Sequence, residues 1–305
     1  MLIGPVPISQ IDPHPGVTGL AIGVFDGVHL GHQAVVRSLE GKEGKVAALT
    51  FEPHPLAIIA PDRVPPRLTT LEQKVAYMRA QGAVTVVAVK FDDELRNMEP
   101  AQFVDEIARV FPDLRQVAIG EGWSFGKNRA GNADRLAALA DKHGFGVNAI
   151  APVMFESAPV SSTRIREAIA QRNFDFAAKL LGRSYAVTGK VIRGDQRGRT
   201  LGFPTANIAE VEQLLPPRGV YACRARIAAH LTRYKAVMNL GARPTFTSNG
   251  VDALEVHILD FDSDLYDQKL WVSDLHWLRN EQAFPDATAL KAQIEEDVAR
   301  ARAVL

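Results

Sequence analysis

Short apolar runs alternate with amphipathic segments along roughly the first 180 residues of the chain. Nearly continuous apolar runs are typical of parallel strands that are buried on both faces, and the segments between them have helical spacing. The predicted strands are Thr18–Phe25, Lys45–Phe51, Val84–Val89, Gln116–Ile119 and Val147–Ala151. The predicted helices are Gln33–Leu39, Leu71–Gln81, Pro100–Val110 and Asp134–Lys142. This pattern indicates an α/β domain with a helix-covered parallel sheet.

The pattern changes after Gly182. Strand-like segments follow one another there, separated by turns rich in glycine and proline, which favours an antiparallel barrel or sandwich. The predicted strands are Tyr185–Val191, Val220–Ile227, Lys235–Leu240 and Leu254–Phe261. The last segment, Ala287–Val304, returns to helical spacing. We therefore expect two domains, residues 1–182 and 183–305.

Composition narrows the class of protein. The chain has 305 residues, of which 47% are hydrophobic, and its 35 basic and 35 acidic residues give no net charge. This balance argues against a general nucleic-acid binder. A single cysteine excludes an intrachain disulfide, and neither a basic leader nor a long apolar segment is seen. We expect a cytoplasmic protein without membrane or nucleic-acid partners.

The first candidate site is the segment GVFDGVHLGHQ, which follows a predicted strand and opens a helix. A helix N-terminus attracts anions, and Gly27 and Gly31 allow the backbone to approach a phosphate closely. His29 and His32 are three residues apart, so both can reach phosphate oxygens from one face of the first turn. The alternative is a pair of surface histidines that cap the helix, at about even odds for such a pair alone. A zinc site is disfavoured because no third ligand lies nearby in the sequence.

Two further segments support a phosphate site. TFEPHP, residues 50–55, ends a predicted strand, where open α/β sheets bind their ligands. VSSTRIR, residues 160–166, places two hydroxyls and two arginines at the start of a helix, where arginine can neutralise a transferring phosphoryl group. In isolation the second segment is more often an N-cap followed by solvated charges.

The C-terminal half contains a second set of candidates. Gly194, Gly198 and Gly202 suggest a loop around a phosphate. Thr205 and Asn207 offer the oxygen ligands that Mg²⁺ accepts beside nucleotide phosphates. Glu255 lies on an alternating strand, where a carboxylate near ATP can orient or deprotonate a hydroxyl. Alone, these features are more often a proline-led turn and a solvent-facing strand residue.

The N-terminal motifs closely resemble the adenylyltransferase module of bacterial bifunctional riboflavin kinase/FAD synthetases, a Rossmann-like nucleotidyltransferase of the HxGH class. The resemblance implies that FMN attacks the α-phosphorus of ATP and releases pyrophosphate. It assigns catalytic contacts to His29, His32 and Arg164. The implied ATP and phosphate contacts are Gly23, Phe25, Gly27, Gly31, Ser161, Ser162, Thr163 and Arg166.

The C-terminal motifs are similar, in the same order, to the riboflavin kinase module, an all-β barrel with a terminal helix. They are GRTLGFPTAN, GVYA, VMNLGARPTF, LEVHILDF, LYDQKLWV and LRNEQAF. The resemblance implies that Thr205 and Asn207 bind Mg²⁺ with ATP, that Gly198 and Gly202 cover the phosphates, and that Glu255 is the base toward riboflavin. The implied flavin contacts are Arg279 in this module and Phe125 and Arg129 in the adenylyltransferase module.

One position departs from the family pattern. The family usually has Asp or Asn in a G-x-(Asp/Asn)-Phe-x-Phe-Gly segment, whereas this chain reads GEGWSFG with Gly122 there. The principal hypothesis is an enzyme that makes FMN from riboflavin and ATP and then FAD from FMN and ATP. One alternative is a riboflavin kinase with a degenerate adenylyltransferase domain. The other is a non-catalytic flavin- or RNA-binding regulator.

Overall fold

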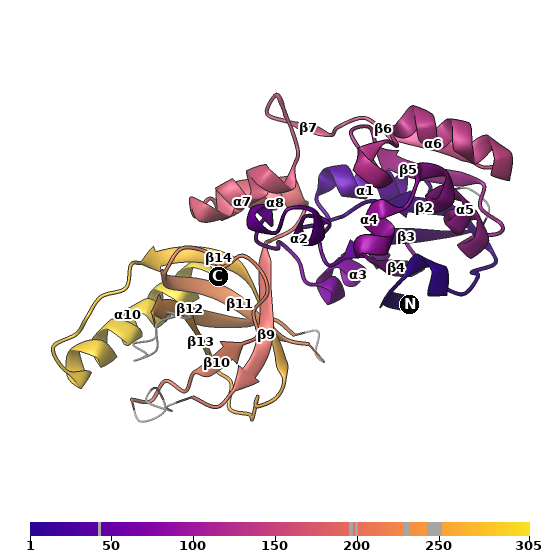
Figure 1. Cartoon of the computed structure of the whole chain (residues 1–305). Helices are drawn as coiled ribbons and strands as arrows, with labels where there is room; N and C mark the ends of the chain where they lie inside the picture. Colours follow the sequence, from indigo (N-terminus) through magenta and orange to yellow (C-terminus); the bar gives the residue numbers. More distant parts are fainter. Residues whose placement is uncertain (42–43, 195–197, 199–200, 229–231, 243–251) are drawn as a thin grey trace. The chain divides into compact units, whose positions relative to one another are not determined.

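The computed structural model describes residues 1–41, 44–194, 198, 201–228, 232–242 and 252–305. By its contacts the chain divides into two compact units, Met1–Ser162 and Thr163–Leu305. Each unit has its own sheet (Figure 1). Among the described residues, no helix is both long and apolar enough to cross a membrane.

The N-terminal unit is built on a six-stranded parallel sheet in the order β1-β4-β3-β2-β5-β6. The strands are β1 (Leu2–Val6), β2 (Val17–Ile22), β3 (Lys45–Glu52), β4 (Thr85–Lys90), β5 (Gln116–Gly120) and β6 (Gly146–Ile150). A short hairpin, β7 (Met154–Phe155) and β8 (Ala158–Pro159), follows. The strand order reverses at β2, so the ends of β2, β3 and β5 form the crevice where open α/β sheets bind ligands.

Helices cover both faces of this sheet (Figure 1). They are α1 (Leu30–Arg37), α2 (Leu56–Ile59), α3 (Leu71–Arg79), α4 (Asp93–Asn97), α5 (Pro100–Val110) and α6 (Ala133–Ala140). One apolar cluster joins α1 and α3 to the sheet and the other joins α5 and α6 to it. Short 3₁₀ turns lie at Ile8–Gln10, Pro61–Arg63, Lys127–Arg129 and Asp141–His143. The predicted doubly covered parallel sheet is therefore confirmed.

The C-terminal unit contains a closed six-stranded barrel in the order β10-β13-β12-β11-β14-β9, with antiparallel pairs. Its elements are α7 (Ser162–Ala170), α8 (Phe174–Leu181), β9 (Ala186–Ile192), β10 (Ala206–Ala209), β11 (Gly219–Ile227), β12 (Tyr234–Ala242), β13 (Asp252–Ile258), β14 (Lys269–Arg279) and α10 (Ala287–Val304). Helix α10 packs on the outside of the barrel through Val298 and Ala301 (Figure 1). The predicted barrel and terminal helix are confirmed.

Candidate functional sites

The turn between β2 and α1 has a backbone conformation that residues other than glycine rarely adopt. Phe25 and Val28 have φ angles of 54° and 41°, and Gly27 has a φ of 83°. The predicted strand Thr18–Phe25 therefore ends earlier, at Ile22, because the backbone reverses into this turn. Such strain persists only where surrounding contacts fix it, and it is common at functional sites.

Four side chains fix this turn by hydrogen bonds. The Asp26 carboxylate accepts the backbone N–H groups of Leu68 and Thr69 at 3.0 and 3.2 Å. The Thr69 hydroxyl accepts the Gly27 N–H at 3.1 Å. The side chains of Thr50 and Gln33 donate to the backbone carbonyls of Val24 and Val28 respectively, at 3.0 and 2.9 Å. The turn is therefore preorganised, at the switch point of the sheet.

The two histidines lie together at the N-terminus of α1. The His29 Nδ1 accepts the backbone N–H of His32 at 3.4 Å, which makes His29 the N-cap. Their rings stack with centroids 3.6 Å apart, and His29 is only 7% exposed. The sequence left open whether the histidines cap the helix or form a phosphate site. In the structure His29 caps the helix, and both histidines lie at the helix N-terminus, which attracts anions.

The serine-rich segment reaches the same turn. The Ser162 hydroxyl donates to the Asp26 carbonyl at 2.9 Å. A Cβ added to Gly31 would lie 3.2 Å from the His29 ring and 3.9 Å from the Val160 carbonyl oxygen. Gly31 thus lies between the His29 ring and the start of the VSSTRIR segment.

The rest of that segment enters α7, where Ser162 begins the helix. Thr163, Arg164 and Arg166 fall in the C-terminal unit by their contacts, and the Arg164 guanidinium lies 5.3 Å from the centroid of the Phe176 ring. Ser161 and Arg166 are half-buried. Phosphate contacts of Ser161, Ser162, Thr163, Arg164 and Arg166 stay predictions.

The 120–131 loop forms an aromatic platform. The Trp123 and Phe125 rings stack at 4.9 Å, and Phe125 packs on Phe103 of α5. The Arg129 Nε donates to the Ser124 hydroxyl at 2.8 Å, and the Arg129 side chain is exposed. Phe125 is 7% exposed and lies in an apolar cluster. Its flavin contact, like that of Arg129, stays a prediction.

In the barrel, a row of polar residues crosses three strands. Asn207 of β10 and Asn239 of β12 both stand directly opposite Glu255 of β13. Directly opposed residues on antiparallel strands share a face, so the carboxylate lies between two amides on the outer face. Among the residues that the structure describes, Asn207 and Glu255 have no side-chain hydrogen bond.

Two contacts place the PTAN segment beside this row. The His257 Nδ1 lies 2.8 Å from the Pro204 carbonyl oxygen, and its ring contacts Phe203 edge-on. A Cβ at Gly198 would clash with the Phe203 carbonyl oxygen and approach the Thr205 hydroxyl, and one at Gly194 would clash with the Asn207 amide. Gly202 has a φ of 90°. Residues 195–197, 199 and 200 of the predicted phosphate loop lie outside the described residues.

Arg279 occupies a different environment from Glu255. Its guanidinium makes a two-pronged ion pair with Asp297 of α10, with Nε and Nη2 donating at 2.8 to 3.0 Å. The Asp297 side chain is 2% exposed and that of Arg279 is 17% exposed. This pair holds α10 against β14, and a flavin contact of Arg279 stays a prediction.

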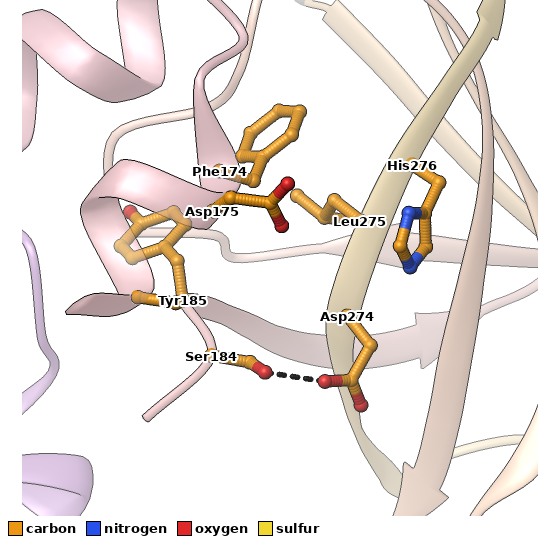
Figure 2. Close-up of a pocket in the computed structure, with 8 residues that line it drawn as sticks. Phe174, Asp175, Ser184, Tyr185, Asp274, Leu275 and His276 are labelled. Carbon is orange, nitrogen blue, oxygen red and sulfur yellow. Dashed lines mark hydrogen bonds between the residues drawn. The ribbon is translucent and has the colours of Figure 1, made fainter. Parts of the chain in front are cut away.

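A hollow of about 210 Å³ in the C-terminal unit contains none of the predicted site residues. Figure 2 shows Ser184 donating to Asp274 across it. Asp274 sits at a bulge of β14 with a φ of 54° and also accepts the Ser273 hydroxyl. These contacts tie the chain before β9 to β14.

Sequence reasoning missed the supports of the first site. Asp26, Thr50 and Thr69 act through contacts that span 26 to 43 positions of the chain. Lys74, whose buried ammonium lies next to Thr50, was also not singled out. A lysine on the buried face of a helix that follows a predicted site strand is the one signal that points to it.

The parallel sheet with its preorganised turn and the small barrel with its carboxylate–amide row are the two domains of a transferase. Residues 12–164 match the FAD synthetase family model and residues 181–305 the riboflavin kinase model. The chain belongs to the family of bifunctional riboflavin kinase/FMN adenylyltransferases.

Individual relatives agree over nearly the whole length. The bifunctional riboflavin kinase/FMN adenylyltransferase of Haemophilus influenzae is 38% identical, with 93% of each chain covered. That of Escherichia coli K12 is 36% identical, covering 93% of this chain and 91% of the relative. A crystal structure described as a macrolide-efflux protein from Streptococcus pneumoniae has a TM-score of 0.83 at 27% identity, with 99% and 98% of the two chains covered.

Proposed function

We propose that the chain first transfers the γ-phosphoryl group of ATP to the ribityl 5′-hydroxyl of riboflavin, and then transfers AMP from a second ATP to FMN. The first step yields FMN and ADP, and the second yields FAD and pyrophosphate. The observation that carries the proposal is the placement of Glu255 directly opposite Asn207, which brings a candidate base next to the PTAN segment.

In the kinase step, Glu255 accepts the proton of the attacking hydroxyl. Phosphoryl transfer depends mainly on positioning of the reactants and on charge stabilisation. The main requirement for the base is therefore that it lies close to the attacking hydroxyl and to the phosphates. Gly198 and Gly202 are proposed to cover the phosphates, and Arg279 is a proposed flavin contact.

Thr205 and Asn207 would hold Mg²⁺ in this site. Their hydroxyl and amide oxygens are neutral, which suits an ion that takes most of its remaining ligands from nucleotide phosphates and water. The Asn207 amide has no hydrogen-bond partner among the described residues, so its oxygen is available to the ion. When bound, the ion would neutralise charge on the ATP phosphates.

In the adenylyl step, an FMN phosphate oxygen attacks the α-phosphorus and the bond to pyrophosphate breaks. His29 and His32 donate to phosphate oxygens as negative charge moves to the leaving group. The backbone of Gly23, Phe25, Gly27 and Gly31 supplies the cradle. We assign Ser161, Ser162, Thr163, Arg164 and Arg166 to the phosphates and Phe125 and Arg129 to the flavin. The proposed compartment is the cytoplasm.

The test is an incubation of the purified chain with riboflavin, ATP and Mg²⁺, followed by chromatography with fluorescence detection. We expect FMN to appear first and FAD to follow. FMN that accumulates without FAD, even when FMN is supplied, would favour the kinase-only alternative. Flavin binding without turnover would favour the non-catalytic regulator.

A further inference from the structure

Lys74 is a buried cation next to the adenylyltransferase turn. Lys74 is 4% exposed, and its Nζ lies 3.2 Å from the Thr50 hydroxyl oxygen. No ion pair within 4 Å joins it to another residue that the structure describes. Burying an ammonium costs free energy unless the ammonium is paired with an opposite charge and hydrogen-bonded.

Three charged side chains, those of Glu52, Asp26 and Arg67, act on Lys74. Glu52 lies at the end of β3, Asp26 lies in the turn after β2, and Arg67 lies before α3 and pairs with Glu52. Burial lowers the pKa of Lys74 to about 8, with the two carboxylates opposing that shift and Arg67 adding to it. The side chain is therefore mostly an ammonium at neutral pH and loses its proton just above it.

Its proton sets the direction of a hydrogen-bond chain. An ammonium can only donate, so Thr50 accepts from Lys74 and directs its own hydrogen to the Val24 carbonyl, 3.0 Å away. A neutral amine has a lone pair, and Thr50 can then donate to Lys74 instead. The Val24 carbonyl would lose its partner immediately before the strained Phe25.

We infer that Lys74 is a positioning residue for adenylyl transfer, which holds the Val24–Val28 turn in its phosphate-binding conformation through the Thr50 hydroxyl. The ammonium also offsets Asp26 and Glu52 at the edge of the sheet where an anionic substrate must bind. This inference rests on the proposed adenylyltransferase function of the same unit.

The first experiment compares the wild-type chain with Lys74→Met and Lys74→Arg. FMN and ATP are supplied, and kcat and KM for FAD formation are measured from about pH 7 to pH 9.5, around the lowered pKa. We expect kcat/KM of the wild type to fall as the pH rises through about 8. Lys74→Met should be about tenfold slower at pH 7 and lack that fall. Lys74→Arg should be active and keep its rate to higher pH, because arginine stays protonated.

Unfolding caused by the deprotonation of Lys74 does not explain the expected fall in rate. Between pH 8 and 10.5 the folded chain binds fewer protons at Lys74 than the unfolded chain does, so this group's contribution to stability rises with pH. Riboflavin phosphorylation by the same sample is the internal control, and we expect it to be equal in all three proteins.

A second pair of variants decides the matter if Lys74→Met does not fold. Thr50→Val keeps the shape of the side chain and removes the hydroxyl, whereas Thr50→Ser keeps the hydroxyl. We expect the valine variant to lose rate and the pH-dependent fall, and the serine variant to behave like the wild type. Wild-type kinetics in Thr50→Val, or an unchanged fall above pH 8 in a folded Lys74→Met, would overturn the inference. A wild-type chain that forms FMN but no FAD would instead contradict the proposed function.

Discussion

The two sites are held in place by different kinds of structure. In the N-terminal unit, the site is a strained turn whose shape depends on hydrogen bonds from Asp26, Thr50 and Thr69. In the barrel, the candidate base and its amide neighbours stand on paired strands, so the ladder itself sets their spacing. The first site should therefore respond to substitutions that never touch substrate, whereas the second should respond chiefly to loss of its own side chains.

The largest effect on activity should come from Glu255, in the row of polar residues on the barrel. Glu255→Gln keeps the size and polarity of the side chain and removes the base. We expect riboflavin phosphorylation to fall by about 10² to 10⁴. FAD formation from supplied FMN should be unchanged, because it takes place in the other unit. Both rates are measured on one preparation, and a wild-type kinase rate would remove Glu255 from its role.

The histidine pair should give the reverse result. His32→Ala removes a proposed phosphate contact but keeps the backbone N–H that donates to the His29 cap, so FAD formation should fall by about 10² to 10³ while FMN formation continues. His29→Ala should also destabilise the N-terminal unit by about 1 kcal/mol, because it removes the N-cap.

His29→Asn is the matched control, since asparagine restores a cap but no imidazole. It should regain stability in a thermal melt and not the rate. Loss of both activities in His32→Ala would point to coupling of the two units instead.

The same contrast explains how much the sequence could predict. Local patterns identified the parallel sheet and the histidine turn, and they indicated that the second half is a barrel or a sandwich. The resemblance to the riboflavin kinase module selected the barrel. Three strands of the two main sheets were missed: Leu2–Val6 is interrupted by Pro5, Ala206–Ala209 is very short, and Lys269–Arg279 is broken by a bulge at Asp274. The two-residue strands of the β7–β8 hairpin were missed as well. Their periodicity is too weak to recognise.

Of the candidate sites, the motif residues could be identified and their supports could not. Asp26 and Thr69 meet only because α3 begins beside the β2–α1 turn, which no local pattern specifies. For Arg279 the motif identified the residue but not its environment. Its ion-pair partner, Asp297, lies 18 positions further along the chain in α10.

Arg279 can be tested by breaking its ion pair. Arg279→Met leaves the buried Asp297 carboxylate without its partner and should destabilise the C-terminal unit by about 3 kcal/mol. Asp297→Leu should have a similar effect, and the double variant should recover most of the loss, because two apolar side chains can replace a buried pair. Denaturation followed by tryptophan fluorescence measures all three. If Arg279 contacts the flavin instead, its variant should raise the KM for riboflavin far more than Asp297→Leu does.

The smallest effect should come from Gly122, the position that departs from the family pattern. Gly122 is exposed, and a Cβ built there meets no atom within 4 Å, so Gly122→Asp should change the free energy of unfolding by less than about 0.5 kcal/mol.

Because Trp123 and Phe125 already fix the loop by stacking, FAD formation should also stay within about twofold. The control in the same loop is Gly126→Ala, where φ is 71° and a Cβ would lie 2.7 Å from Pro100, so stability should fall there. A tenfold or greater gain of FAD formation in Gly122→Asp would show that the missing carboxylate, rather than the turn after β2, limits this unit.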